Sequence, residues 1–117
     1  MKVLICEDDP VPAAVIKLAL KRDGIEVVHV SDGRKAMELL RTSIFDLIIT
    51  DIHLPYHNGD EILTLVRVEQ GKKVPIIMVS SDTEEEVINL ALKSGVNEFV
   101  KKPLQHAQME KVLKKYL

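Results

Sequence analysis

Residues 45–51 read Phe-Asp-Leu-Ile-Ile-Thr-Asp, and this stretch decides the fold. Its first six residues form a largely apolar run of strand length that is rich in Leu and Ile, and the run ends at the acidic Asp51. A nearly continuous apolar run is typical of a strand covered on both faces, as in a parallel sheet between two layers of helices. The stretch therefore predicts a buried strand with a carboxylate at its carboxyl end.

Four similar runs lie elsewhere in the chain, at Val3 to Cys6, Ile25 to Val30, Val74 to Val79 and Asn97 to Lys101. Apolar residues at helical spacing follow each of the five runs. These predicted buried stripes are Val11, Ala14, Val15 and Leu18; Ala36, Leu39 and Leu40; Ile62, Leu65 and Val66; Val87, Leu90 and Ala91; and Met109, Val112, Leu113 and Tyr116.

Turn and cap residues support these boundaries. Gly24, Gly71 and Gly95 stand where helices should end, because glycine readily takes the left-handed conformation that closes a helix. Thr83 and Glu86 have the spacing of a capping box at a helix start. We therefore expect the fourth helix to begin there.

Strict alternation of strand and helix predicts an α/β fold with five parallel strands, (βα)5. Five strands do not close a barrel, so we expect an open, doubly wound sheet of flavodoxin-like strand order 2-1-3-4-5. The first and third strands are neighbours in that order. Ligands of such sheets bind beyond the carboxyl ends of the strands, where the winding reverses.

Composition excludes several classes of protein. The 117 residues, 46% of them hydrophobic, suit one compact domain over residues 1–117. A net charge of −2 gives no electrostatic support for binding nucleic acid or an anionic membrane directly. The single Cys6 cannot form an internal disulfide, and no apolar segment is long enough to span a bilayer. We therefore expect a cytoplasmic location.

Acidic residues follow two strands that should be neighbours. Glu7 and Asp8 come after the first strand, and Asp51 after the third. Clustered carboxylates repel one another unless a cation neutralises them, and oxygen ligands favour Mg²⁺ or Mn²⁺. Ser80 and Lys102 follow the fourth and fifth strands. One such residue alone is more often a solvated loop residue, but the five together predict a phosphoryl-transfer site with Asp51 as nucleophile.

The same residues carry a family resemblance. Glu7-Asp8, residues 51–55 with Gly59, Ser80, and Lys102-Pro103 resemble response regulator receiver domains of two-component systems, over the whole chain. The resemblance implies that a histidine kinase or a histidine phosphotransfer domain phosphorylates Asp51. It also implies that Mg²⁺ binds directly to Asp8 and Asp51, through water to Glu7, and to the carbonyl of His53. Asp9 would be a bystander.

Further roles follow from the resemblance alone. Ser80 and Lys102 would bind the phosphoryl group, and Phe99 would move with the switch. His53 and Asp82 would tune the phosphoryl lifetime, and the Lys102–Pro103 bond would be cis. Residues 83–117 would present the switched surface to a downstream protein or an output domain. The chain departs from the usual family pattern at three positions. It has Leu54 where Met is usual, Ser80 where Thr is commoner, and Ser81 where Ala is frequent.

The sequence leaves several rival functions open. A flavin or nucleotide module needs glycines and N–H donors after the first strand, where this chain has acidic residues. A phosphatase acting through an aspartyl-phosphate needs a general acid, for which His53 and His57 are the candidates. Pro55 argues against a zinc site on those two histidines, and His29 should be solvated. A phosphorylation-independent binding module is a further rival. We expect a signalling domain without enzymatic turnover, and the sequence does not distinguish a stand-alone protein from a domain of a larger regulator.

Overall fold

The computed structural model describes residues 1–82 and 84–117. These residues form five strands: β1 (Lys2–Cys6), β2 (Glu26–Val30), β3 (Leu47–Asp51), β4 (Ile76–Ser80) and β5 (Glu98–Lys101). The helical segments of this described chain are α1 (Pro10–Ala19), α2 (Gly33–Thr42), α3 (Gly59–Thr64) with its π-helical continuation η1 (Leu65–Glu69), α4 (Glu85–Lys93) and α5 (His106–Leu113).

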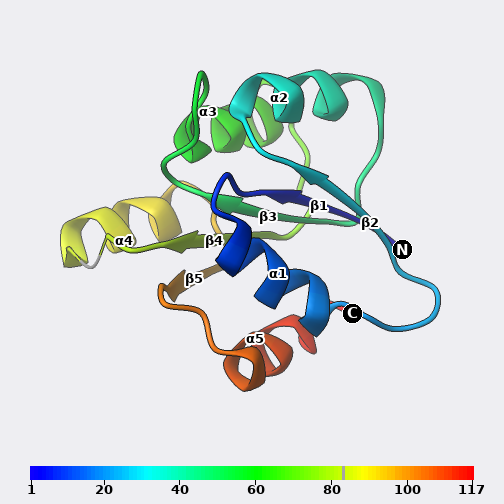
Figure 1. The fold of residues 1–117 in the computed structure, drawn as a ribbon. Coiled ribbons are helices and arrows are strands. Elements are labelled where there is room, and N and C mark those ends of the chain that lie inside the picture. Colours follow the sequence, from blue (N-terminus) through cyan, green and yellow to red (C-terminus); the bar gives the residue numbers. More distant parts are fainter. Residues whose placement is uncertain (83) are drawn as a thin grey trace.

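The strands form one parallel sheet in the order β2-β1-β3-β4-β5, which confirms the predicted fold class. Helices α1 and α5 cover one face, and α2, α3 and α4 cover the other (Figure 1). Successive residues of a strand enter opposite cores. In β3, Ile48 packs under α2 and α3, whereas Ile49 packs under α1 and α5. This two-sided burial is the reason for the nearly continuous apolar runs.

Predicted strand limits hold to within about two residues. The largest shifts are at β3, which begins at Leu47 rather than at Phe45, and at β4, which begins at Ile76 rather than at Val74. Pro75 has no N–H to give to a neighbouring strand, although its carbonyl accepts a hydrogen bond from the Ile48 N–H at 3.0 Å. Asp51 and Ser80 are the last residues of their strands rather than the first residues after them.

The predicted buried face of α1 is wrong. Val11 is 70% exposed and Leu18 is 57% exposed. The helix instead buries Pro12, Ala13, Ile16 and Ala19. Its sequence, PVPAAVIKLA, is apolar on more than one side, so two faces satisfy a helical period.

The stripe predicted on α4 is wrong in part. Ala91 is buried and Val87 is half-buried, but Leu90 is 66% exposed. Thr83, the first residue of the predicted capping box, lies outside the described residues. The helix starts at Glu85 with Glu84 as the residue before it. Gly71 and Gly95 directly follow the helix ends at Gln70 and Ser94 with φ of 61° and 110°, as predicted. Gly24 has a φ of 84°, but it does not close α1, which already ends at Ala19.

In the described part of the chain, every helix is too short or too polar to span a bilayer.

Candidate functional site

The site forms where the winding of the sheet reverses, between β1 and β3. Glu7 and Asp8 directly follow β1, and Asp51 ends β3 beside them. One carboxylate oxygen from each residue lies within 4.8 Å of the other two. Glu7 and Asp51 are buried and Asp8 is exposed. The structure thus brings together the three carboxylates that the sequence predicts.

Lys102 supplies the positive charge of the site. Its Nζ lies 2.6 Å from Oδ2 of Asp51 and 2.6 Å from Oε1 of Glu7. The backbone N–H of Lys102 donates to the Ser80 carbonyl at 2.8 Å, which fixes the base of the lysine side chain against β4. One ammonium group therefore contacts two buried carboxylates at once.

These contacts and burial shift the protonation of both partners. Burial raises the pKa of Glu7 to about 7, although Lys102 and the Asp9 N–H oppose this rise. Burial alone would lower the pKa of Lys102, but Asp51 and Glu7 outweigh it and raise that pKa above its usual value. Lys102 is therefore charged at neutral pH, while Glu7 is close to its titration point.

Backbone groups hold the two buried carboxylates in place. The His53 N–H donates to Oδ1 of Asp51 at 3.0 Å, and the Asp9 N–H donates to Oε2 of Glu7 at 3.2 Å. Asp51 thus has one oxygen on an N–H and the other on Lys102. A Cβ on Gly59 would stand 2.6 Å from the Asp51 carbonyl oxygen, so only glycine fits beside Asp51.

Ser80, Asp82 and Phe99 lie on the β4 and β5 side of the site. Ser80 is buried at the end of β4, and its Oγ accepts the Asp82 N–H at 3.1 Å. Phe99 lies on β5, is half-buried, and packs against the core under α2, α3 and α4. The His53 side chain is exposed, so this residue contacts Asp51 through its backbone.

Two residues without a predicted role also take part. Asp9 caps α1, because its Oδ1 accepts the Val11 N–H at 3.0 Å, while its own N–H binds Glu7. An Asp directly before Pro10 is a helix-start pattern that could have identified this role. His29 is half-buried rather than solvated, and its Nε2 lies 2.9 Å from the Glu7 carbonyl, to which it donates. No sequence spacing indicated that contact.

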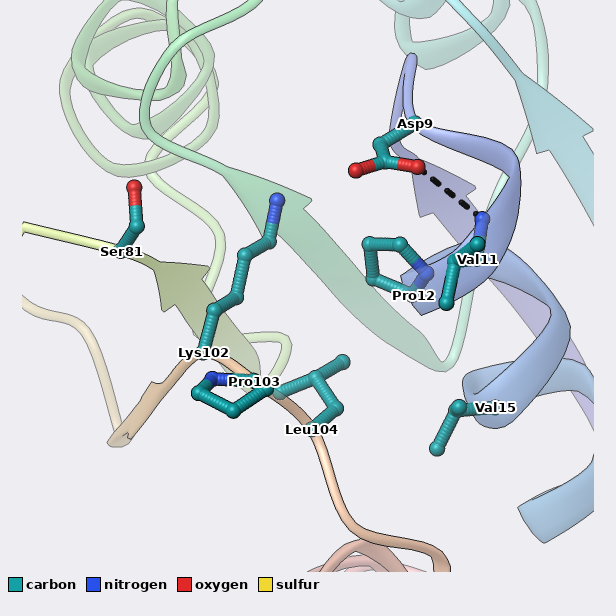
Figure 2. A pocket seen from close by; sticks show the side chains of 8 residues that line it. All are labelled: Asp9, Val11, Pro12, Val15, Ser81, Lys102, Pro103 and Leu104. Atoms are coloured by element: carbon teal, nitrogen blue, oxygen red, sulfur yellow. Dashed lines mark hydrogen bonds between the residues drawn. The ribbon is translucent and has the colours of Figure 1, made fainter.

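A pocket of about 390 Å³ opens beside Lys102, between the start of α1 and the segment after β5. Figure 2 shows the Lys102 and Asp9 side chains at its polar end and Pro12, Val15 and Leu104 at its apolar end. The Lys102–Pro103 peptide bond in its wall is cis. Val11 and Val15, which the helical spacing predicted to be buried, therefore line this pocket next to the carboxylates.

The donor set fits a hard divalent cation. Three carboxylates converge, and the exposed Asp8 leaves room for water ligands on the solvent side, as Mg²⁺ and Mn²⁺ require. Among the described residues, neither His53 nor His57 belongs to this carboxylate cluster. A zinc site on these two histidines therefore has no support. His57 Nδ1 instead lies 2.6 Å from Glu61 Oε2.

Comparison with known proteins agrees with this geometry. The model of the response regulator receiver domain family matches residues 3–114. The chain therefore belongs to the response regulator receiver domain family, which is a family of signalling domains.

Two curated relatives illustrate the range of the family. The DNA-binding response regulator MtrA of Mycolicibacterium smegmatis is 30% identical over 108 residues, which are 92% of this chain and 46% of MtrA. Hybrid signal transduction histidine kinase M of Dictyostelium discoideum is 37% identical over 119 positions, covering 97% of this chain and 5% of the kinase. The chain thus spans about half, or far less, of the length of these relatives.

Solved structures share the fold over nearly the whole chain. The phosphorylated cyanobacterial phytochrome response regulator RcpA has a TM-score of 0.86 and 26% identity, covering 98% of this chain and 92% of RcpA. The receiver domain of sensor histidine kinase PA1611 from Pseudomonas aeruginosa, with a magnesium ion in its active site cleft, has a TM-score of 0.82 and 29% identity. It is matched over 98% of this chain and 95% of that domain.

Proposed function

We propose that this single domain, residues 1–117, accepts a phosphoryl group on Asp51 from a phosphohistidine donor. The donor would be a histidine kinase or a histidine phosphotransfer domain. One observation carries the proposal: the Asp51 carboxylate is held between the His53 N–H at 3.0 Å and Lys102 Nζ at 2.6 Å, inside a cluster of three carboxylates.

The residues of the chain suit each part of the transfer. An Asp51 oxygen attacks phosphorus as the bond from phosphorus to the donor's imidazole nitrogen breaks, and that nitrogen regains its lone pair. The Lys102 ammonium group already contacts one Asp51 oxygen, so its charge would stabilise the negative charge that the phosphoryl group adds. Ser80 offers a hydroxyl from the adjacent strand end. The pocket beside Lys102 would accommodate a side chain of the donor next to the site.

We propose Mg²⁺, or Mn²⁺, as the cofactor, with Asp8 and Asp51 as direct ligands, Glu7 acting through water, and the His53 carbonyl completing the set. When bound, such a cation neutralises the carboxylates and the transferring phosphoryl oxygens. The magnesium-bound receiver domain of PA1611 supports this choice.

The remaining roles are also proposals. Phosphorylation would change the conformation of Phe99 and of the surface formed by residues 83–117. That surface would bind a downstream protein or an output domain, in the cytoplasm. His53 and Asp82 would tune the lifetime of the aspartyl phosphate. The domain would assist its own phosphorylation and dephosphorylation without acting on another substrate.

Intact-mass measurement with acetyl phosphate tests the proposal. Wild-type protein with Mg²⁺ should gain the mass of one phosphoryl group, and Asp51→Asn should gain none. Asp60→Asn, which removes an exposed carboxylate of α3, should behave as wild type. Equal gain by wild type and Asp51→Asn would refute Asp51 as acceptor.

The metal part has its own readout. Asp8→Asn should weaken Mg²⁺ binding, measured by calorimetry on unphosphorylated protein, whereas Asp60→Asn should not. Equal affinity of Asp8→Asn and wild type would refute the proposed ligand set. Absence of both phosphorylation and Mg²⁺ binding would favour the phosphorylation-independent binding module. If Mg²⁺ still bound, a histidine-phosphorylated partner would be the next donor to test.

A further inference from the structure

The segment between β3 and α3, residues 52–58, contains a strained turn at Tyr56. The His57 N–H donates to the Pro55 carbonyl at 2.9 Å, two residues back, and Tyr56 between them has a φ of 71°. These features define a γ-turn of the rare, strained form. Among the described residues, Tyr56 is the only one other than glycine with a positive φ. Such a conformation persists only where the surrounding structure holds it.

The contacts that hold this γ-turn come from the start of α2. Helices α2 and α3 lie side by side on one face of the sheet (Figure 1). The Gly33 N–H donates to the Pro55 carbonyl at 2.9 Å, so that this carbonyl accepts two N–H groups. The Arg34 guanidinium lies over the Tyr56 ring, 4.1 Å from its centroid. Consecutive residues of α2 thus hold consecutive residues of the γ-turn.

The start of α2 is closely fitted to the loop. Gly33 is buried at the first position of the helix, and a Cβ there would overlap the backbone carbonyl of His57. Asp32 caps the helix, because its Oδ1 accepts the Lys35 N–H at 2.8 Å. The loop backbone therefore lies directly against a helix end that is itself fixed.

The supported loop also holds the Asp51 carboxylate. The His53 N–H donates to Asp51 Oδ1 at 3.0 Å, and only two residues separate His53 from Tyr56. One of them, Leu54, packs in the core under α2, α3 and α4 and fixes the inner side of the loop. A relaxation of φ at Tyr56 would turn this short connection about Leu54. The His53 N–H would then move relative to Asp51.

We propose that Gly33 and Arg34 are positioning residues of the carboxylate site, which hold the γ-turn at Tyr56 and so keep the His53 backbone aligned with Asp51. The inference rests on the proposed function, because it gives both residues a part in Mg²⁺ binding and phosphoryl transfer. Both act through the loop, from a helix that follows a different strand.

The amide resonance of His53 in NMR spectra of the unphosphorylated protein in EDTA tests the inference. Asp51→Ala removes the acceptor and gives the resonance position of a His53 N–H without this bond. Arg34→Ala should move the resonance part of the way towards that position. Gly33→Ala should move it further, because its Cβ displaces the loop backbone. Arg34→Ala provides the test if Gly33→Ala does not fold.

Lys35→Ala is the matched control, because Lys35 is the next residue of α2, is exposed, and has its Nζ 3.7 Å from Glu38 Oε1. It should leave the His53 resonance at its wild-type position. Tyr56→Phe keeps the ring and should also behave as wild type. In Tyr56→Gly protein, Arg34→Ala should have no further effect, because the ring is absent and glycine takes a positive φ without strain.

Mg²⁺ affinity provides a second readout, by calorimetry on unphosphorylated protein that urea unfolding shows to be folded. Arg34→Ala should weaken binding about two- to fivefold, the size expected for loss of an exposed cation–π contact. Lys35→Ala should bind as wild type. Absence of Mg²⁺ binding by wild type would refute the proposed metal ligands, and the His53 resonance in EDTA would still decide the inference.

Three results would overturn the inference. One is a His53 resonance that stays at its wild-type position in Arg34→Ala, since α2 would then not hold the loop. Another is an Arg34→Ala effect of the same size in Tyr56→Gly protein, since the contact with the ring would then not be its cause. The third is unchanged Mg²⁺ affinity in Arg34→Ala, where wild type binds Mg²⁺, despite a shifted resonance.

Discussion

Helices α1 and α4 both lie beside the carboxylate site, yet they are held in different ways. Asp9 caps α1 and also binds Glu7, and four of the ten α1 residues are buried. Helix α4 buries one of nine residues and is anchored at the end away from the site, through Arg67. A change of charge at Asp51 therefore lies between a helix that buries four residues and a helix that buries one.

The difference has a consequence for signalling. A ligand or modification shifts a conformational equilibrium only through an element that has an accessible alternative position. Helix α4 buries only Ala91, and two short-range hydrogen bonds, from Glu84 to Asp82 and from Asp82 to Ser80, connect its start to the site. Helix α1 instead offers a constant surface beside the pocket, with Val11 and Val15 in its lining.

Truncating one apolar side chain on each helix should give the largest difference in unfolding free energy between α1 and α4. Ile16→Ala on α1 should lower the free energy of unfolding by about 2–5 kcal/mol, because the side chain is fully buried. Leu90→Ala on α4 should change it by less than about 0.5 kcal/mol, because that residue is exposed. Urea unfolding followed by circular dichroism provides the measurement. Equal losses would mean that α4 is packed as firmly as α1.

Removing the positive charge of Lys102 should have the next largest effect on the free energy of unfolding. In Lys102→Met, two buried carboxylates lose their shared partner, so we expect a loss of about 1–3 kcal/mol near neutral pH without divalent cations. Lys101→Met removes the same charge from an exposed neighbour and should cost less than about 0.5 kcal/mol. Urea unfolding of both variants in EDTA compares them.

The loss in Lys102→Met should depend on pH in a defined direction. Burial raises the pKa of Glu7 to about 7, so the cost of its charged form is felt as the pH rises through that value. The deficit should therefore be largest above about pH 7 and shrink as the pH falls. A deficit that grows on acidification would show that the pairing with Glu7 is not its cause.

Cap removal should give the smallest of these differences. Asp9→Ala removes the side-chain cap of α1 and should cost about 1 kcal/mol. Glu84→Ala, at the matching position of α4, should change stability by only a few tenths of a kcal/mol, because the Glu84 side chain makes no capping bond among the described residues. Thermal unfolding by calorimetry compares them. A larger loss in Glu84→Ala would reverse the expected order.

Sequence reasoning located the sheet and the site because both depend on local signals. Apolar runs identified the strands, and the parallel topology brought their carboxyl ends together, which placed Glu7, Asp8 and Asp51 at one edge. The side chains at that edge are set by strand order, so a correct strand order was enough to predict their proximity.

The errors arose where several local solutions satisfy the same pattern. Helix α1 is apolar around much of its circumference, so its buried face depends on contacts with the sheet and not on periodicity. The π-helical turn at Leu65–Glu69 depends on which carbonyl each N–H selects; the Gln70 N–H bonds to the Leu65 carbonyl, five residues back. Arg67 gave no sequence signal, because its acceptors are the backbone carbonyls of Gly95 and Lys72 and the side chain of Asn97, none of which has a recognisable spacing from it.

Amide exchange before and after phosphorylation tests the central claim most directly. The protein would be compared with and without acetyl phosphate in Mg²⁺, with Asp51→Asn as the control. Exchange should change most in the first turn of α4 and at Asp82, change little at Ser94 and Val96, and stay constant in α1. Changes centred on α1, or spread evenly over the domain in protein that carries the phosphoryl group, would contradict the account.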